Sequence, residues 1–318
     1  MLYAGYDIGG TKCAVSLGRV ENGALEVLAK SKFPTEGSPD KVIDGLAAAL
    51  FALLSERRLS PRDVRAAGVS CGGPLDSRRG LVLSPPNLPG WDEIPIVRLL
   101  EEKTGIPTRL QNDANACAVA EWKFGAGRGT RDMAFLTFGT GLGAGLILDG
   151  KLYSGASDMA GEVGHVRLAD DGPLGYGKYG SAEGFCSGGG IARTGVSYAA
   201  RGEAPRLLEA ANGNLNNITA KLIAELADAG DAPCRKIYGD CGRRLGMLLS
   251  FLMDIVNPER IVLGGVFMRS EALIRPSMEA VISAEALPHA ARACRVVPAG
   301  LGEAIGDYAA LSVGALEG

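Results

Sequence analysis

The chain has 318 residues, more than one domain usually contains, so we expect two lobes that share a cleft. Its 33 basic and 36 acidic residues give a net charge of −3, and the absence of a basic stripe argues against nucleic-acid binding. No apolar run approaches the roughly 20 residues of a membrane span, and the N-terminus starts directly as a strand, so we expect a cytoplasmic protein without a signal peptide.

A hydrophobic fraction of 47% and 46 glycines predict a well-buried α/β enzyme that is rich in tight turns. The chain has seven cysteines, an odd number, and they are scattered through apolar or small-residue stretches. Without a CxxC or another close pair, they predict buried reduced thiols and no metal clip. They are Cys13, Cys71, Cys117, Cys186, Cys234, Cys241 and Cys294.

The first predicted elements are two apolar strands around a Gly-Gly-Thr turn, in residues 3–17. A third antiparallel strand follows over residues 24–33, and Ser38 caps a helix that is predicted to run to about Arg58. The next strand, residues 65–71, ends at Gly72-Gly73-Pro74. Such an ending is consistent with backbone that approaches a ligand and equally with a plain turn.

A proline-rich loop over residues 84–91 is read as a rigid connection. A short helix (96–103) and a strand (107–111) lead to Asn112-Asp113, where the chain turns into a helix that ends near Phe124. Asp113 is either a helix N-cap or, at the carboxyl end of a strand where open α/β sheets bind ligands, a catalytic base.

A second glycine turn lies in residues 133–149 (MAFLTFGTGLGAGLILD), again between two apolar strands. Glycines allow positive φ and close approach, and consecutive turn amides can bind an anion, although a turn that needs glycine only for its dihedrals is the alternative. One such turn in each half predicts a duplicated core that grips a polyphosphate. The chain has no GxxxxGK[ST] sequence, and both turns run into strands rather than helices, which argues against a dinucleotide-binding fingerprint.

Glu162 and His165 are three residues apart, so a helical or turned segment would place them on one face. They suit a polyhydroxylated ligand or a metal, or they form a surface ion pair. The glycine-rich stretch 174–184 precedes a small-residue helix that starts at residues 187–190. Further helices are predicted at 207–229, 238–256, 270–283 and 303–315, and further strands at 260–263 and 295–298. The strand 260–263 enters Gly264-Gly265.

Taken together, these residues resemble the ROK family (repressors, open reading frames and sugar kinases) of the actin-like ATPase superfamily. Six motifs occur in order over nearly the whole length: Asp7-Ile8-Gly9-Gly10-Thr11-Lys12, Pro86-Asn87-Leu88-Pro89-Gly90-Trp91, Asn112-Asp113-Ala114-Asn115-Ala116, residues 138–145, Glu162-Val163-Gly164-His165 and Leu263-Gly264-Gly265. The resemblance implies an α/β, two-lobed actin-like ATPase (ribonuclease H-like) fold with a duplicated core and a central cleft. The expected lobes are residues 1–112, completed by the C-terminal helix of about 303–318, and residues 113–302.

The resemblance also implies an ATP-dependent sugar kinase that phosphorylates a hexose or hexosamine, at the 6-hydroxyl, with Asp113 as the general base. Asp7 is expected to hold Mg²⁺ through water. The remaining roles implied are sugar binding by Gly73, Asn87, Asn112, Asp113, Glu162, His165 and Glu183, and ATP binding by Asp7, Gly9, Gly10, Thr11, Lys12, Gly139, Thr140, Gly141, Gly143, Gly264 and Gly265. A homodimer is the family expectation for the assembly.

One departure from the family pattern concerns a structural zinc site. The family usually carries CxCGxxGCxE after the histidine, whereas here Leu174, Tyr176 and Ser181 stand at the cysteine positions and only the glycines and Glu183 remain. Without thiolates we expect no structural zinc. Packing would then have to hold the loop, with Tyr176 and Tyr179 as candidate fillers.

Two other functions are compatible with the resemblance. A sugar-responsive repressor of the same family would need an N-terminal helix-turn-helix, for which a strand that begins at Leu2 or Tyr3 leaves no room. A catalytically inactive sugar sensor is disfavoured because Asp113 and both glycine turns are retained. The sequence does not discriminate among hexoses, because their recognition depends on shape around Gly72, Gly73 and Asn87.

Overall fold

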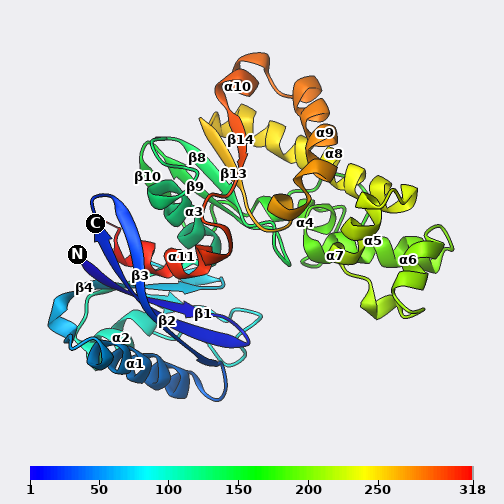
Figure 1. Ribbon diagram of the computed structural model, residues 1–318. Coiled ribbons are helices and arrows are strands. Elements are labelled where there is room, and N and C mark those ends of the chain that lie inside the picture. The colour runs from blue at the N-terminus through cyan, green and yellow to red at the C-terminus, as the bar shows by residue number, and fades with distance from the viewer. Residues whose placement is uncertain (317–318) are drawn as a thin grey trace. The chain divides into compact units, whose positions relative to one another are not determined.

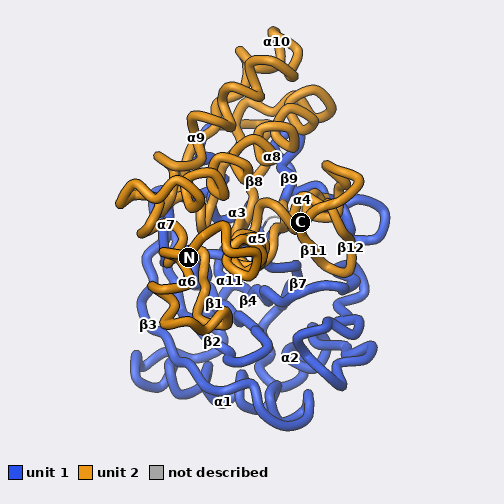
Figure 2. The backbone as a smooth tube through the Cα atoms, turned by 90° about the vertical axis from the view of Figure 1, so that its right-hand side faces the viewer, with its two compact units in different colours: residues 1–129, 145–160, 300–318 blue, residues 130–144, 161–299 orange. Residues whose placement is uncertain are grey.

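The computed structural model describes residues 1–316, so the last two residues of the predicted C-terminal helix lie outside the described part of the chain. Two compact units are present (Figure 2). Unit 1 contains Met1–Gly129, Gly145–Ala160 and the C-terminal stretch from Gly300, and unit 2 contains Thr130–Ala144 and Gly161–Ala299. The predicted lobes divide the chain at a different place, after residue 112.

Unit 1 is built on a five-stranded sheet with the strand order β3-β2-β1-β4-β7. The first three strands form the predicted antiparallel start, and β1, β4 and β7 run parallel. The strands are β1 (Leu2–Ile8), β2 (Lys12–Glu21), β3 (Ala24–Pro34), β4 (Val64–Cys71) and β7 (Thr108–Asn112).

Helices cover both faces of this sheet, as the alternation of side chains along β1 requires. Leu2, Ala4, Tyr6 and Ile8 belong to the core cluster with α1 (Pro39–Glu56) and α2 (Ile96–Thr104). The intervening residue Tyr3 packs with Leu311 of α11 (Ile305–Gly314). Figure 1 shows α11 against one face of the sheet, with α1 and α2 on the other.

The C-terminal helix α11 approaches the sheet backbone directly, because glycines on β1 and β4 leave room for it. A Cβ added at Gly68 would lie 2.1 Å from the carbonyl oxygen of Ala310, and one at Gly5 would lie 2.9 Å from the N atom of Leu311. Ala116 of α3 (Asp113–Phe124) packs with Ala309 and Val313 of the same helix. Helix α11 therefore packs tightly against the sheet and α3 of unit 1.

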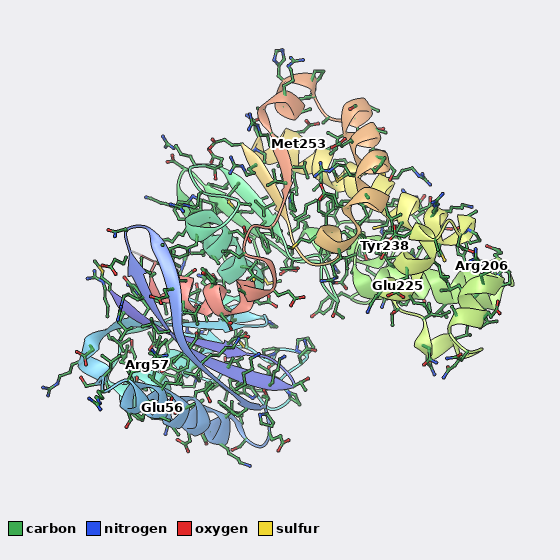
Figure 3. All side chains as sticks on the ribbon, viewed as in Figure 1. Glu56, Arg57, Arg206, Glu225, Tyr238 and Met253 are labelled. Atoms are coloured by element: carbon green, nitrogen blue, oxygen red, sulfur yellow. The ribbon has the colours of Figure 1, made fainter. Side chains whose placement is uncertain are left out.

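Unit 2 contains the parallel strands β8 (Met133–Leu136), β13 (Arg260–Leu263) and β14 (Arg295–Pro298). Its two long helices, α8 (Ala232–Val256) and α9 (Val266–Glu285), pack closely through glycines of α8, since a Cβ at Gly242 would lie 2.5 Å from the Ile274 carbonyl oxygen. Figure 3 labels Tyr238 and Met253 on α8, and both side chains are buried. The Tyr238 hydroxyl donates to the Ala220 carbonyl at 2.9 Å.

Short elements complete the described chain. The remaining helices are α4 (Ala182–Phe185), α5 (Gly188–Ala200), α6 (Pro205–Ala210), α7 (Ala220–Asp228) and α10 (Pro288–Ala293), with 3₁₀ turns η1 (Pro61–Asp63), η2 (Val163–His165), η3 (Leu215–Asn217) and η4 (Gly302–Ala304). The remaining strands are β5 (Leu75–Asp76), β6 (Leu81–Val82), β9 (Ala144–Leu148), β10 (Lys151–Tyr153), β11 (Leu174–Gly175) and β12 (Lys178–Tyr179).

The prediction of one helix over residues 207–229 is wrong. Helix α6 ends at Ala210, and Asn212 and Gly213 adopt positive φ values of 54° and 71°. The side chain of Thr219 then caps α7 by accepting from the N–H of Leu222. The local turn and cap signals therefore override the helical hydrophobic pattern.

All seven cysteines are free thiols, and six of them are buried while Cys117 is partly exposed. This confirms the prediction of reduced thiols. Within residues 1–316, the structure contains no helix with both the length and the apolar character needed to cross a membrane.

Candidate functional site

The three parallel strands of unit 1 end in register, which gathers the predicted residues at one edge of the sheet. Ile8 pairs with Cys71, and Cys71 pairs with Asn112. Asp7 and Asp113 therefore lie at the carboxyl edge, where open α/β sheets bind ligands.

The first glycine turn (residues 9–12) is fixed by hydrogen bonds to Gly9 and has two N–H groups that are not used within it. The N–H of Gly9 donates to the Lys12 carbonyl at 3.1 Å, and the Thr35 hydroxyl donates to the Gly9 carbonyl at 2.7 Å. The N–H groups of Gly10 and Thr11 have no acceptor among the described residues, and both residues are exposed. Two adjacent unused donors at an exposed glycine turn are suited to an anion.

Asn87 lies directly against this turn. A Cβ added at Gly10 would lie 2.5 Å from the Asn87 carbonyl oxygen, so only glycine fits there. The neighbouring Leu88 and Trp91 are buried in the core and anchor the proline-rich loop, while Asn87 itself is exposed. The loop is thus a rigid connection that also positions Asn87 beside the first glycine turn.

Asp113 is not the N-cap of α3, so that alternative is wrong. The cap is Asn112, whose Oδ1 accepts from the N–H of Asn115 at 2.7 Å. The Asp113 carboxylate accepts from the adjacent N–H of Ala114 at 2.8 Å, and the residue keeps accessible surface at the sheet edge although protein surrounds it closely. Desolvation by the surrounding protein raises the pKa of Asp113 above its ordinary value, against the opposing effect of backbone hydrogen bonds.

Asp7 is a second acid at the same edge. Desolvation by burial is the largest cause that raises its pKa to about 6, and repulsion by the Asp113 carboxylate is the next. Lys30 and Lys12 act in the opposite direction. The edge therefore holds two mutually repelling carboxylates, an arrangement that a bound cation would stabilise.

Gly72 and Gly73 also lie at this edge, and they are not required by close packing. A Cβ added at either glycine would have no heavy atom within 4 Å. The peptide bond between Gly73 and Pro74 is cis. The space in front of these glycines is open to a ligand.

In unit 2, the second glycine turn (residues 138–144 of the predicted motif) follows β8, which ends in register with β13 through Leu136 and Leu263. The turn is held internally, since the N–H of Gly139 donates to the Gly141 carbonyl and the N–H of Gly143 donates to the Thr137 hydroxyl. The N–H groups of Thr140 and Gly141 have no acceptor in the described part of the chain. This turn therefore repeats the pair of unused donors that is found in unit 1.

Gly264 and Gly265 pack against the start of the second glycine turn. The N–H of Gly264 donates to the Leu136 carbonyl at 2.9 Å, and the N–H of Val266 donates to the Phe138 carbonyl at 2.7 Å. A Cβ at Gly265 would lie 2.0 Å from the Phe138 carbonyl oxygen. The positive φ of 57° at Gly265 also favours glycine.

Glu183 contacts the second glycine turn from the other side. Its Oε2 accepts from the N–H of Leu142 at 3.1 Å. The start of α5 adds two bonds, from the N–H of Gly188 to the Gly139 carbonyl at 2.8 Å and from the N–H of Gly189 to the Thr140 carbonyl at 3.2 Å. The Ser-Gly-Gly-Gly run at residues 187–190 predicts a helix start, but nothing in the local sequence indicates its contact with the turn.

Glu162 is the N-cap of a 3₁₀ turn, η2, and His165 is its last residue, and both residues are exposed. Gly164, inside η2, packs against the Leu142 carbonyl, since a Cβ there would lie 2.1 Å from that oxygen. Unit 2 therefore brings Glu162, His165 and Glu183 to the neighbourhood of the second glycine turn.

The loop that lacks the zinc cysteines is not held by its tyrosines, so that prediction is wrong. Tyr176 and Tyr179 are 70% and 62% exposed. The loop is held by Ser181, which is fully buried, donates to the Gly175 carbonyl at 3.3 Å and accepts from the N–H of Gly184 at 3.1 Å. Ser181, one of the residues expected at a cysteine position, therefore holds the loop through the hydrogen bonds of a helix cap.

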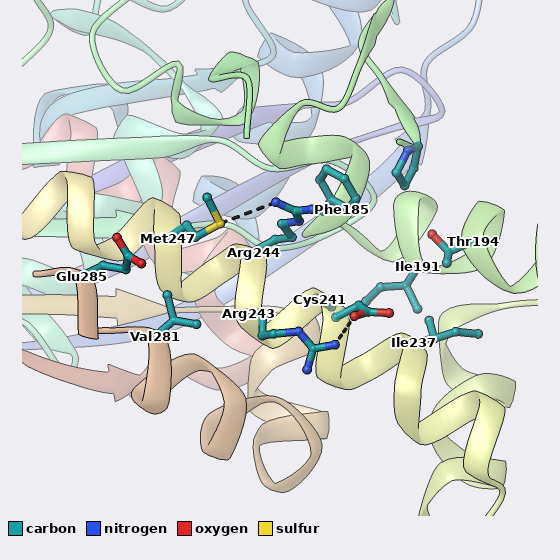
Figure 4. Close-up of a pocket in the computed structure, with 12 residues that line it drawn as sticks. Phe185, Ile191, Thr194, Ile237, Cys241, Arg243, Arg244, Met247, Val281 and Glu285 are labelled. Atoms are coloured by element: carbon teal, nitrogen blue, oxygen red, sulfur yellow. Dashed lines mark hydrogen bonds and ion pairs between the residues drawn. The ribbon is translucent and has the colours of Figure 1, made fainter. Parts of the chain in front are cut away.

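A cavity of about 480 Å³ lies elsewhere in unit 2, between α5, α8 and α9 (Figure 4). None of the predicted site residues lines it. Arg244 reaches across it, with its guanidinium 4.8 Å from the centre of the Phe185 ring. The cavity thus adjoins the end of α4, the short helix that carries Glu183, without being part of the glycine-turn site.

Comparison with known proteins gives one consistent result. A sequence model of the ROK family matches residues 3–313. The chain is 33% identical over 267 residues to a glucokinase of Streptomyces coelicolor, covering 83% of this chain and 81% of that protein. It is 34% identical over 280 residues to an N-acetylmannosamine kinase of Salmonella typhi, covering 84% and 93%.

Solved structures agree with the sequence relatives. A ROK family glucokinase from Streptomyces griseus, in complex with glucose and AMPPNP, matches with a TM-score of 0.77 at 30% identity over 99% of both chains. A ROK family transcriptional regulator, a homologue of the E. coli MLC protein, matches with a TM-score of 0.83 at 26% identity over 98% of this chain and 77% of that chain. The predicted actin-like α/β fold is confirmed.

Proposed function

Because the chain belongs to the ROK family and is an ATP-dependent sugar kinase, we propose that it phosphorylates a hexose or hexosamine with Asp113 as the general base. This proposal rests on the position of Asp113 and on the fact that it does not cap α3. The residue lies at the carboxyl edge of the sheet with accessible surface, and Asn112 caps α3. A carboxylate that is not engaged as a cap can accept the proton of a sugar hydroxyl.

The phosphates of ATP are proposed to bind at the two glycine turns. Gly10 and Thr11 offer two unused N–H donors in unit 1, and Thr140 and Gly141 offer two in unit 2. Phosphoryl transfer depends mainly on positioning and charge neutralisation, which such donors supply. The full proposed set is Asp7, Gly9, Gly10, Thr11, Lys12, Gly139, Thr140, Gly141 and Gly143, with Gly264 and Gly265 on the adenosine side.

Asp7 is the proposed contact of Mg²⁺, through water. Two carboxylates that repel each other at one sheet edge fit a divalent cation, because its charge would offset the burial and the repulsion that together raise the pKa of Asp7. When bound, the ion neutralises charge on the phosphates. The role of the protein is to hold the Asp7 carboxylate at the end of β1, next to the first glycine turn.

The sugar is proposed to bind through polar groups at the carboxyl edge of the unit 1 sheet and near the second glycine turn. Asn112 uses its Oδ1 in the cap, which leaves its Nδ2 as a donor. Glu162 and His165 are exposed on η2, and one Glu183 oxygen is not engaged by Leu142. Gly73 and Asn87 complete the proposed sugar set. The 6-hydroxyl of the sugar is the proposed acceptor of the phosphoryl group. The protein is proposed to act in the cytoplasm as a homodimer.

An ADP-release assay with a panel of single sugars tests this function. We expect turnover with at least one hexose or N-acetylhexosamine, dependent on ATP and Mg²⁺, and a loss of at least 10²-fold in kcat in Asp113→Asn, the lower end of what a general base contributes. Sugar binding to Asp113→Asn, measured by calorimetry, should persist. Sugar binding without turnover by the wild-type protein would instead support a sensor or regulator and refute the kinase proposal.

A further inference from the structure

A second pocket, of about 290 Å³, lies in unit 1 and contains none of the residues assigned above to ATP or sugar. It is formed by the turn after β5, by one residue of α2, by β7 and by the end of the chain that the structure describes. Its lining consists of Ser77, Arg78, Arg79, Gly80, Val97, Thr108, Arg109, Leu110, Gln111 and Leu316. Three of these residues are arginines and none is acidic.

The guanidinium groups of these arginines are only partly used within the protein. Arg109 donates from one Nη to the Gly314 carbonyl at 3.0 Å, and Arg78 donates to the Gly155 carbonyl at 3.5 Å. Arg79 is 67% exposed and its nearest carboxylate, Asp76, lies 3.9 Å away. Since each guanidinium has five N–H donors, most donors around the pocket remain available.

The nearby acids are engaged by backbone or hydroxyl donors. One Asp76 oxygen accepts from the N–H of Arg79 at 2.8 Å. Asp158 accepts from both the N–H and the hydroxyl of Ser77, each at 2.8 Å. These bonds fix the turn, so the arginines are presented by a braced loop and by a strand inside a sheet rather than by a flexible segment.

We propose that this pocket binds a phosphate group, either as inorganic phosphate or as the phosphoryl end of a small phosphate ester. Guanidinium groups match phosphate oxygens with paired, charge-assisted hydrogen bonds. Gln111 adds a neutral donor, because its Oε1 accepts from Asn115 and its Nε2 has no acceptor within residues 1–316. A volume of about 290 Å³ suits a ligand at the small end of the range for such sites.

The pocket is adjacent in sequence to the proposed base. Arg109 and Gln111 lie on β7, which leads directly into Asn112 and Asp113. Gln111 also contacts α3 through Asn115 at 3.1 Å. A phosphate bound here would therefore rest on the strand that carries the catalytic edge, although the proposal itself does not depend on the kinase reaction.

Calorimetric titration at low salt tests the proposal, with inorganic phosphate and glucose 6-phosphate as separate probes. The double variant Arg78→Gln, Arg79→Gln should bind the better probe at least tenfold more weakly than the wild type, since each charged hydrogen bond lost is worth about tenfold. Arg62→Gln removes the same kind of charge from an exposed position of unit 1 outside the pocket, and it should bind normally. Any binding of phosphate at the glycine turns should be unchanged in both the double variant and Arg62→Gln.

The two probes distinguish the sources of the phosphate group. Equal affinity would identify the anion alone as the ligand. Binding of the ester that is at least tenfold tighter, and whose advantage is lost in the double variant, would show that the pocket also contacts its organic part, because ester bound at the glycine turns would keep its affinity in that variant. The proposal is overturned if neither probe binds, if the double variant binds both as the wild type does, or if Arg62→Gln loses as much affinity. Thermal melts of each variant, without probe, verify that the fold is retained.

Discussion

The Glu183 carboxylate accepts a hydrogen bond from the backbone N–H of Leu142 at 3.1 Å. The same oxygen lies only 2.6 Å from where a Cβ of Gly141 would be, so the glycine is required for this contact. Helix α4 and the second glycine turn thus fix each other, and a residue proposed to bind sugar also shapes a turn proposed to bind phosphate.

Substitution of Glu183 should separate these two roles. Glu183→Ala removes the acceptor of Leu142 and should lower the free energy of unfolding by about 1 kcal/mol, while the KM for sugar rises at least tenfold. Glu183→Gln keeps a carbonyl oxygen for Leu142 and should restore stability without restoring the sugar KM. Denaturant melts and kinetics of the two variants check this, and an unchanged KM in both would remove Glu183 from the sugar site.

The acid side of the pH profile should report the pKa of Asp113. A general base works only when deprotonated, so kcat/KM should fall as pH decreases through a pKa that lies above the ordinary 3.8. Because Asp7 has a pKa of about 6 without a metal and repels Asp113, the two acids should titrate as a coupled pair.

Calorimetric binding of sugar over the same pH range is the control for this profile. Binding that weakens in parallel with kcat/KM would place the titration in the sugar contacts instead. A rate that stays constant down to about pH 4 would contradict a raised pKa at the base.

The local patterns of the sequence were sufficient to predict both glycine turns and the position of Asp113. Each of these features is set by a few consecutive residues, because glycines at a strand end and a polar pair before a helix determine their own backbone. The contact between Asn87 and Gly10 and the one between Glu183 and Leu142 join segments far apart in the chain. Nothing in the local sequence specifies such pairings.

The wrong prediction for the loop tyrosines and the open alternative for Asp113 both depend on contacts that the local sequence does not specify. Tyr176 and Tyr179 have the size of core residues, but the buried hydroxyl of Ser181 already satisfies the backbone of the loop and leaves them exposed. Asp113 has the character of an N-cap, yet Asn112 stands one position earlier and takes that role. In both cases another polar side chain of the same segment takes the structural role, and this depends on the three-dimensional arrangement.

The ionised Asp7 carboxylate should lower the free energy of unfolding at neutral pH. Its folded pKa of about 6 exceeds the ordinary 3.8, so the folded state holds the proton more tightly than the unfolded state, and stability is lost as pH rises from about 4 to 6. In the absence of Mg²⁺ and ATP, Asp7→Asn should therefore raise the free energy of unfolding at pH 7.5 by about 1–3 kcal/mol. The upper end corresponds to a pKa difference of about two units between the folded and unfolded states.

Urea melts at pH 4 and pH 7.5 measure this gain, which should disappear at the lower pH. Asp63→Asn is the opposite control, because hydrogen bonds from Ser60 lower the pKa of Asp63 and its removal should bring no gain at pH 7.5. A destabilised Asp7→Asn at pH 7.5 would show that the carboxylate is well accommodated in the fold.

Gly68 should be intolerant of even the smallest side chain. A Cβ there would lie 2.1 Å from the Ala310 carbonyl oxygen and 2.3 Å from the Gly314 N atom, which are backbone atoms that cannot move without shifting α11. Gly68→Ala should therefore lower the free energy of unfolding by about 1–3 kcal/mol or more, the usual cost of overpacking. Gly72→Ala, at the end of the same strand, meets no atom within 4 Å and should change stability little. Equal denaturant midpoints for the two variants would mean that α11 does not rest on this sheet as closely as the structure places it.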